Sequence, residues 1–276
     1  MKIKYLGTGG CEGMPALFCR CENCKKALRL GGKELRSRAN FLIDDKLMLE
    51  FPADAYWHTV VNKIDLSAVS DLLFTHSHSD HLYTDDLMHR CFSSIDVRTE
   101  RMLRIYGNGG VKAAYEKTLA NFDAADIAET FSLVNAGETF EAGEYVVTAF
   151  KTTHMNTEDS LVYLIKKGDK AYLHLVDSAY PNEELFDYLA ANKIYLNAIT
   201  ADCTFGNMHE EYFGHMNVWQ NARLKARLEK EGVIDENTKY VLTHFSHYTG
   251  DTYDALTTTA EALGMIVSYD GMELEI

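Results

Sequence analysis

Prolines, interdomain linkers and long apolar runs are all scarce in this sequence. The 276 residues contain only three prolines, and no serine- or glycine-rich stretch divides the chain. Because linkers between domains are usually rich in such residues, we expect one domain over residues 1–276. No apolar run approaches the roughly 18 residues that a membrane-spanning helix needs. We therefore expect no membrane association.

Long basic runs and a secretory signal are also missing. The net charge is −14, so a large polyanion such as RNA would be repelled unless a local basic patch exists. Residues 1–6 alternate like a first strand and lack the apolar core of a signal peptide. We expect a cytoplasmic protein that acts on a small molecule and has no nucleic-acid partner.

Cysteines are few but clustered. Four of the six lie between positions 11 and 24, and in a cytoplasmic chain such clustering points to metal before disulfides. Cys19, Cys21 and Cys24 form a Cys-x-Cys-x-x-Cys motif, which offers three thiolates on a tight loop, one short of the four ligands of structural zinc. We expect a zinc loop at about residues 11–24, with the fourth ligand supplied from elsewhere.

Potential metal ligands are densest in the hexapeptide His-Ser-His-Ser-Asp-His. It directly follows the apolar run 71–75, which we predict as a buried strand. His76 and His78 are two residues apart, so in an extended chain both point the same way, and Asp80 and His81 follow where a helix could start. Imidazole and carboxylate suit Zn²⁺ or Mn²⁺. We expect this turn to present His76 and His78 to one ion and Asp80 and His81 to a second.

The remaining pattern predicts an α/β fold in which two runs of strands are each followed by helices. Such an order favours two sheets packed together with helices outside. We predict strands at residues 2–6, 39–43, 47–51, 71–75, 101–106, 145–152, 160–166, 170–176, 195–201, 239–243 and 265–269. We predict helices at residues 54–62, 83–94, 110–120, 182–191, 216–231 and 252–263.

Three further candidate ligands each follow a predicted strand. They are His154, Asp177 and His244. The end of a strand, where it opens into a loop, is where α/β proteins place functional groups. Asp177 is the best candidate for a bridge between two ions, because a carboxylate offers two oxygens.

Together these residues resemble the metallo-β-lactamase superfamily of hydrolases. The likeness runs from residues 6–10 (LGTGG), through the hexapeptide, His154 and Asp177, to residues 242–247 (LTHFSH). The resemblance implies an αββα sandwich of two mixed sheets flanked by helices, with two divalent ions, Zn or Mn, in the active site. It assigns one ion to His76, His78, His154 and Asp177. It assigns the other to Asp80, His81, Asp177 and His244.

Within the superfamily, the cysteine motif resembles that of the PhnP-type cyclic phosphodiesterases. That resemblance implies a structural zinc whose fourth ligand is His247, with Cys11 as the alternative, and it implies a homodimer. His215 resembles the family histidine that contacts the scissile phosphate or protonates the leaving group. The family usually supports its ligand histidines with Asp-x-Gly, whereas this sequence has Glu50 there.

The expected activity is hydrolysis of small phosphodiesters, including cyclic ones, by a hydroxide shared between the two ions. Asp80 is expected to fix the ions and the nucleophile, and His215 to donate a proton to the leaving oxygen. Three alternatives share the scaffold. They are an endonuclease that matures tRNA 3′ ends, a carboxyl-ester or lactone hydrolase, and a non-catalytic accessory protein similar to PqqB.

Overall fold

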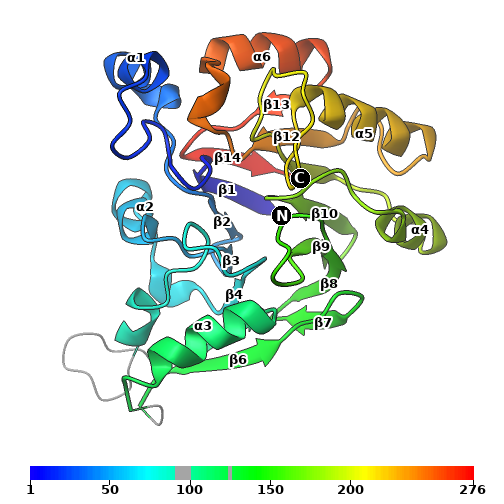
Figure 1. The fold of residues 1–276 in the computed structure, drawn as a ribbon. Helices are drawn as coiled ribbons and strands as arrows, with labels where there is room; N and C mark the ends of the chain where they lie inside the picture. Colours follow the sequence, from blue (N-terminus) through cyan, green and yellow to red (C-terminus); the bar gives the residue numbers. More distant parts are fainter. Residues whose placement is uncertain (91–100, 124–125) are drawn as a thin grey trace.

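Two seven-stranded sheets lie face to face in the computed structural model, which describes residues 1–90, 101–123 and 126–276 (Figure 1). The first sheet contains, in spatial order, β14 (Met272–Glu275), β1 (Lys2–Gly7), β2 (Asn40–Ile43), β3 (Leu47–Leu49), β4 (Asp71–Leu73), β5 (Leu103–Gly107) and β6 (Glu129–Leu133). The second contains β13 (Ile266–Val267), β12 (Lys239–Thr243), β11 (Ala198–Asp202), β10 (Lys170–Leu175), β9 (Leu161–Lys167), β8 (Tyr145–Lys151) and β7 (Thr139–Ala142). Both are mixed, with parallel pairing from β3 to β6 and from β10 to β13.

Helices cover the outer face of each sheet. The α-helices of the described residues are α1 (Glu22–Leu30), α2 (Ala55–Asn62), α3 (Gly109–Leu119), α4 (Glu183–Ala191), α5 (Val218–Lys230) and α6 (Tyr253–Ala262). Ala55 of α2 and Val111 of α3 belong to the apolar cluster outside the first sheet. Leu185, Leu224 and Leu256, from α4, α5 and α6, belong to the cluster outside the second. These layers confirm the predicted αββα sandwich (Figure 1).

The core between the sheets follows from alternation along the strands. In β2, Phe41 and Ile43 point into the cluster that lies between the sheets, whereas Leu42 points into the outer cluster. In β10, Tyr172 likewise faces inward and Leu173 outward. Successive side chains of a strand point to opposite faces, so a strand covered on both faces is apolar throughout.

Most predicted elements are present, with ends shifted by a few residues, but the helix at 83–94 is wrong in its described part. That part contains only a short 3-10 turn, Asp86–His89, and residues 91–94 lie outside the described residues. This turn ends at Arg90, whose carbonyl accepts a hydrogen bond from the Ala128 N–H, just before β6, at 2.7 Å. The sequence did not predict α1, β6, β7 or β14. Across the ranges that the structure describes, no helix is long and apolar enough to cross a membrane.

Glu129 in β6 supplies a test of the fold through its pH dependence. Burial raises the pKa of this carboxyl to about 7, against 4.5 ordinarily, although the Tyr115 hydroxyl and Arg90 oppose the shift. The folded chain therefore holds this proton more tightly than the unfolded chain. The resulting stabilisation is complete below pH 4.5 and is lost as the pH rises through about 7.

We expect the wild-type protein to lose up to about 3 kcal/mol relative to Glu129→Gln between pH 5 and pH 8, since one pKa unit is worth about 1.4 kcal/mol. Urea unfolding of both proteins at the two pH values measures this difference. Glu116→Gln is the control, because Glu116 is exposed on α3. Equal pH dependence of the wild-type and Glu129→Gln proteins would contradict the assignment.

Candidate metal centres

Four loops bring histidines and aspartates together at one edge of the sandwich. β10, β11 and β12 are parallel neighbours, and β8 runs in the direction of β10 because both are antiparallel to β9. Carboxyl ends of such strands meet at the same edge, which brings together His154 after β8, Asp177 after β10 and His244 after β12. The loop after β4 in the first sheet supplies four more: His76, His78, Asp80 and His81.

The first group of potential ligand atoms comes from His76, His78, His154 and Asp177. His78 Nδ1 lies 2.9 Å from His76 Nε2 and 3.1 Å from His154 Nε2. Asp177 Oδ2 lies 3.3 Å from His76 Nε2 and 3.2 Å from His154 Nε2. The structure thus brings together the four residues that the family resemblance assigned to one ion.

The second group comes from Asp80, His81, Asp177 and His244. His81 Nε2 lies 3.0 Å from Asp177 Oδ2 and 3.3 Å from Asp80 Oδ2. His244 Nε2 is farther away, at 3.7 Å from Asp177 Oδ2. Burial opposes the charge on Asp80, but His81 and His244 outweigh it and hold the pKa of Asp80 below its ordinary range. Because Asp177 Oδ2 belongs to both groups, the two candidate positions are adjacent.

Hydrogen bonds behind the imidazoles decide which nitrogen faces the cluster. His76 Nδ1 lies 2.8 Å from Thr75 Oγ1. His154 Nδ1 lies 3.2 Å from the carbonyl oxygen of Gly214. We assign a proton to each Nδ1, which donates to these oxygens and leaves the Nε2 lone pair free for a metal.

In the second group, His244 has the same arrangement, whereas His81 Nδ1 is buried without a hydrogen-bond partner in the part of the chain that the structure describes. His244 Nδ1 lies 2.8 Å from Thr204 Oγ1, and His81 Nδ1 lies 3.5 Å from Glu50 Oε1. Glu50 is fully buried and accepts a hydrogen bond from the Thr75 N–H at 3.2 Å. The structure therefore places Glu50 behind a candidate ligand histidine, the position that the family usually gives to an aspartate.

The spacing of these atoms fits a divalent ion. Nitrogen and oxygen ligands about 2.0–2.1 Å from zinc lie about 3.3 Å apart along the edges of a tetrahedron, and the contacts of the first group span 2.9 to 3.3 Å. Among the described residues, His81 Nε2 and His244 Nε2 are buried without a hydrogen-bond partner. A buried polar atom without a hydrogen-bond partner costs about 1–3 kcal/mol of stability. A cation bound between these two nitrogens would give both a partner.

Backbone strain coincides with this region. Glu50, Asp177 and His244 have positive φ angles of 64°, 55° and 62°. Such conformations are uncommon for residues other than glycine and persist where the surrounding structure enforces them, often at functional sites. The strain at Asp177 and His244 turns each side chain toward the cluster directly after its strand.

His215 lies beside the two groups, just before α5. Its Nδ1 lies 3.0 Å from both Asp202 Oδ2 and Asp177 Oδ1. Burial disfavours the imidazolium, but Asp202 and Asp177 outweigh burial and raise the pKa of His215 to about 11. Burial likewise opposes the charge on Asp202, but His215 and His244 lower its pKa to about 2. The His215 side chain is 21% exposed, so solvent and a small substrate can reach it.

Residues 202–205 resemble a segment of the family, but sequence reasoning gave Asp202 and Thr204 no role in this site. Thr204 Oγ1 lies within hydrogen-bonding distance of His215 Nδ1 and His244 Nδ1, at 3.1 and 2.8 Å. Asp202 is the last residue of β11, between the strands that end near Asp177 and His244. The rule that functional groups follow strand ends could therefore have found it.

A separate site forms around His247. Its Nδ1 lies 3.7 Å from Cys19 Sγ and 3.6 Å from the Sγ atoms of both Cys21 and Cys24. With zinc–sulfur and zinc–nitrogen bonds of about 2.3 and 2.0 Å, a tetrahedral edge is about 3.5 Å, close to these distances. The Cys24 N–H, together with His247, lowers the pKa of the Cys21 thiol to about 6, which favours the thiolate that zinc needs.

Cys11 lies outside this group. It is exposed, and its thiol lies 3.1 Å from Glu12 Oε2. The structure therefore brings His247, and not Cys11, to the three cysteines. Glu12 Oε1 also lies 3.8 Å from His247 Nε2, on the side of the ring opposite the sulfurs.

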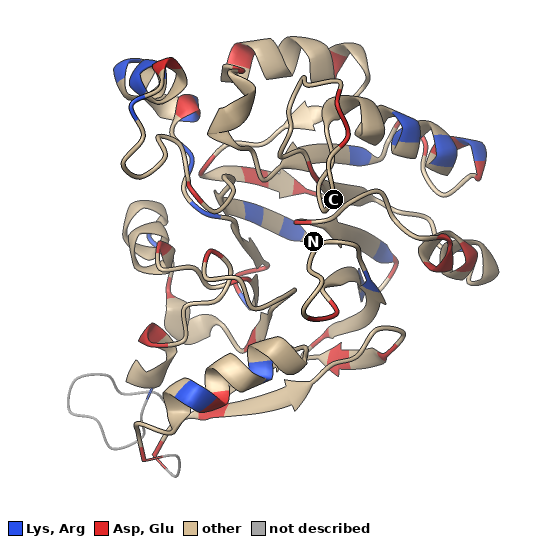
Figure 2. Cartoon of the chain, in the orientation of Figure 1, with Lys and Arg blue, Asp and Glu red and all other residues tan. Residues whose placement is uncertain are grey.

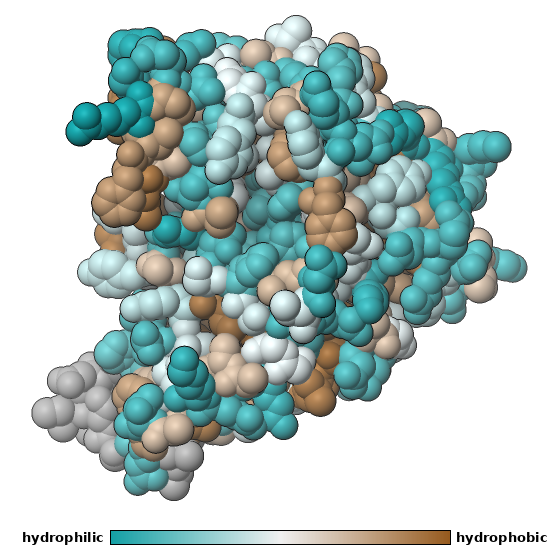
Figure 3. Space-filling view, in the orientation of Figure 1, coloured by the Kyte–Doolittle hydropathy of each residue, from teal (hydrophilic) through white to brown (hydrophobic). Residues whose placement is uncertain are grey.

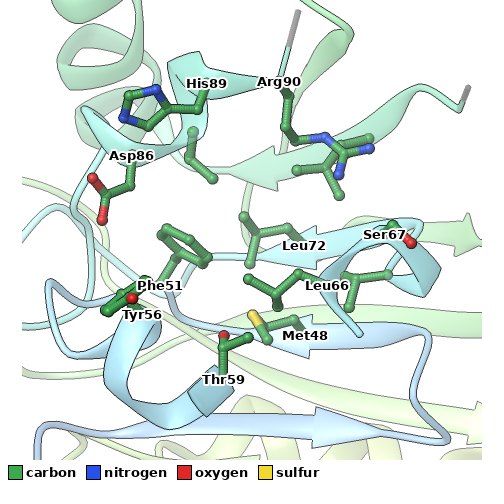
Figure 4. A pocket seen from close by; sticks show the side chains of 13 residues that line it. Met48, Phe51, Tyr56, Thr59, Leu66, Ser67, Leu72, Asp86, His89 and Arg90 are labelled. Carbon is green, nitrogen blue, oxygen red and sulfur yellow. The ribbon is translucent and has the colours of Figure 1, made fainter. Parts of the chain in front are cut away.

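One sizeable cavity lies elsewhere. About 600 Å³ in volume, it is lined by Met48, Phe51 and Leu72 below and by Asp86 and His89 above (Figure 4). Met48 and Leu72 belong to the outer apolar cluster of the first sheet, and none of the clustered ligands lines the cavity. The cavity and the groups of potential metal ligands thus lie in different parts of the protein. We assign the functional site to the ligand groups, because titratable residues converge there.

Comparison with known proteins agrees with this geometry. The family model of the beta-lactamase superfamily domain matches residues 47–245. The sequence matches none of the curated proteins with which it was compared.

Three solved structures show the same fold over the whole chain. Zinc-bound PqqB from Methylobacterium extorquens has a TM-score of 0.73 at 17% identity, with 100% of both chains covered. A diphosphatase from the PhnP family has a TM-score of 0.72 at 20% identity, covering 100% of this chain and 97% of its own. The short form of human tRNase Z has a TM-score of 0.68 at 14% identity, covering 100% of this chain and 99% of its own.

Proposed function

Because this chain belongs to the metallo-β-lactamase superfamily, we propose that it is a metal-dependent hydrolase of small phosphodiesters, cyclic ones included. One observation carries the proposal: Asp177 joins two adjacent groups of metal-ligand atoms, and His215 lies beside it. The two groups would each hold a Zn or Mn ion, and the cysteine site a structural zinc. When bound, a pair of such ions supplies Lewis acidity and a water of lowered pKa.

The other roles in the proposed reaction belong to three aspartates and His215. Asp80 and Asp177 would provide the negative charge needed to hold two cations side by side. Asp202 accepts a hydrogen bond from His215 Nδ1 at 3.0 Å and favours the protonated ring. Within the described residues, the His215 ring makes its hydrogen bonds and ion pairs through Nδ1. Its Nε2 is therefore left to donate toward a leaving oxygen.

Two features favour a phosphodiester over a carboxyl ester. The site gathers a protonated imidazole beside positions for two cations, which suits a substrate whose charge is spread over several phosphoryl oxygens. The chain also combines this site with the three-cysteine and histidine group, and one of the structures with the same fold is a diphosphatase of the PhnP family.

Turnover of defined substrates by the metal-loaded protein tests the proposal. We expect hydrolysis of bis(p-nitrophenyl) phosphate and of 2′,3′-cyclic nucleotides with Zn²⁺ or Mn²⁺, and slower hydrolysis of p-nitrophenyl acetate and of a lactone. Faster turnover of the ester or the lactone would select the carboxyl-ester alternative. No turnover of either phosphodiester with either metal would show that the proposed reaction is wrong.

A second candidate function is endonucleolytic processing of RNA. Lys25, Lys26 and Arg29 lie on the exposed side of α1 and form a local basic patch in an acidic protein (Figure 2). Lys25 is already paired with Glu22, at 2.7 Å, which weakens the patch. Gel-shift binding to precursor tRNA with a steep salt dependence would favour this function over a small substrate.

We also propose a homodimer. Leu17 and Phe18, in the loop before α1, and Trp57 of α2 are 65%, 103% and 59% exposed. Leu17 and Trp57 line one shallow hollow together with Leu28 and Leu35, and Figure 3 shows apolar surface in this region, at the upper left. Apolar side chains gathered in this way on a surface usually mark a protein interface. Sedimentation equilibrium of the intact chain measures the oligomeric state.

A further inference from the structure

Glu158 links two of the loops that carry candidate metal ligands. It lies between β8 and β9, four residues after His154, and its side chain reaches the loop after β4. Its Oε1 accepts a hydrogen bond from the Ser77 N–H at 2.7 Å, and its Oε2 accepts one from Ser77 Oγ at 2.9 Å. Since Ser77 separates His76 from His78, one carboxylate holds the residue between two ligands.

The first turn of α3 fixes the position of that carboxylate. Asn108 caps this helix through its Oδ1, which accepts a hydrogen bond from the Val111 N–H at 2.9 Å. Its Nδ2 donates to the Asp159 carbonyl oxygen at 2.8 Å and to Glu158 Oε1 at 3.3 Å. The carboxylate therefore lies at the amino end of a helix, where the aligned peptide dipoles favour negative charge.

A glycine in the same turn makes room for Glu158. A Cβ atom added to Gly110 would lie 1.4 Å from Glu158 Oε2, so any other residue there must displace the carboxylate. A Cβ added to the neighbouring Gly109 would have nothing within 4 Å. Neither glycine has a positive φ angle, so space and not backbone conformation is what Gly110 provides.

We propose that Glu158 is a positioning residue that ties the His154 loop to the loop of His76 and His78 and thereby sets the affinity of the ion that they hold. The inference rests on the metal site of the proposed function. The bonds from Ser77 to a carboxylate are charge-assisted and stronger than neutral ones. Groups that orient metal ligands in this way typically contribute 10–100-fold to metal affinity.

Zinc affinity measured by competition with a chromophoric chelator tests the role of Glu158. We expect Glu158→Ala to weaken one of the two active-site ions by about 10–100-fold, while the zinc at the cysteine site is retained. Glu158→Gln should lose less affinity, because its amide oxygen can still accept from the Ser77 N–H. The absorption spectrum of the Co²⁺-loaded protein should change in Glu158→Ala, since a displaced histidine alters the ligand geometry.

Gly110→Ala provides a second test that leaves Glu158 in place. We expect it to weaken the same ion by a similar factor, although alanine favours the helix by about 1 kcal/mol. Gly109→Ala is the matched control and should bind zinc like the wild type. In the Glu158→Ala background, Gly110→Ala should cause no further loss, because the group with which its Cβ collides is gone.

The outcomes separate this inference from the proposed function. A wild-type chain that binds no pair of ions at the shared aspartate would overturn both. A wild type that binds the pair, together with a Glu158→Ala protein of unchanged zinc affinity and Co²⁺ spectrum, would overturn the role of Glu158 alone. A loss in Gly110→Ala that persists in the Glu158→Ala background would also overturn it. Far-UV circular dichroism and thermal unfolding establish that each variant is folded.

Discussion

Replacing Asp177 by asparagine is expected to abolish phosphodiester hydrolysis and to leave at most one ion in the active site. Asp177 is the one residue common to both groups of ligand atoms, and it is buried among imidazoles that hold its pKa well below the ordinary range, although burial itself opposes its charge. The amide has nearly the same shape but no charge with which to hold two cations together. We expect kcat/KM to fall by about 10³-fold or more, equivalent to about 4 kcal/mol of transition-state stabilisation.

The measurement needs metal content and turnover from the same preparation. Asp169→Asn is the matched control, because Asp169 is exposed in the turn before β10, at the opposite end of the strand from Asp177. Its metal content and kcat/KM should equal those of the wild type. An Asp177→Asn protein with two active-site ions and wild-type turnover would refute the shared site.

The candidate ligands could be predicted because their signals are local. His76, His78, Asp80 and His81 lie within one hexapeptide, so their spacing alone indicates a common direction. His154, Asp177 and His244 each follow an apolar strand, and a rule about strand ends finds them one at a time. Neither argument says which strands are neighbours, so the grouping around two ions came from the family resemblance.

The residues that support these ligands could not be predicted in the same way. Glu158 and Ser77 are 81 residues apart in the sequence, and their hydrogen bonds exist only because the loops of two sheets meet. Thr204 contacts His244 from 40 residues away. Serine, threonine and glutamate are common in loops, so neither the type nor the spacing of these residues predicts their contacts before the fold is known.

The elements that sequence reasoning missed are short and mostly polar or lie at sheet edges. α1 is nine residues long and mostly polar, and only Cys24 and Ala27 in it are buried, so it contains few apolar residues by which to recognise it. β6 and β7 are edge strands, and in each only the residue at one end is fully buried. Short strands of this kind are stabilised by pairing with one neighbour and need few apolar residues.

One loop connects the two candidate metal centres. His244 belongs to one of the groups of potential ligands that share Asp177, and His247, three residues later, faces the cysteines. The same loop pairs with the amino-terminal segment, because the Phe245 N–H donates to the Thr8 carbonyl oxygen and the Gly10 N–H donates to the Phe245 carbonyl oxygen, both at 3.0 Å. Zinc at the cysteine site would therefore brace the loop that carries an active-site ligand.

Replacing His247 by alanine is expected to remove one zinc per chain and to lower the free energy of unfolding by about 3 kcal/mol or more. Structural zinc contributes roughly 10–16 kcal/mol to the folding of zinc-finger peptides, and three thiolates alone hold it less tightly. Zinc content after dialysis and urea unfolding measure the two effects. Turnover should fall less than in Asp177→Asn, because every ligand of the active-site pair is still present.

Cys11→Ala is the matched control, because it removes a thiol from the same amino-terminal segment that lies outside the group around His247. It should retain the zinc and the stability of the wild type. The opposite pattern, with zinc lost in Cys11→Ala and kept in His247→Ala, would make Cys11 the fourth ligand. In that case the cysteine site would no longer be tied to the loop of His244, and it could not brace the active site.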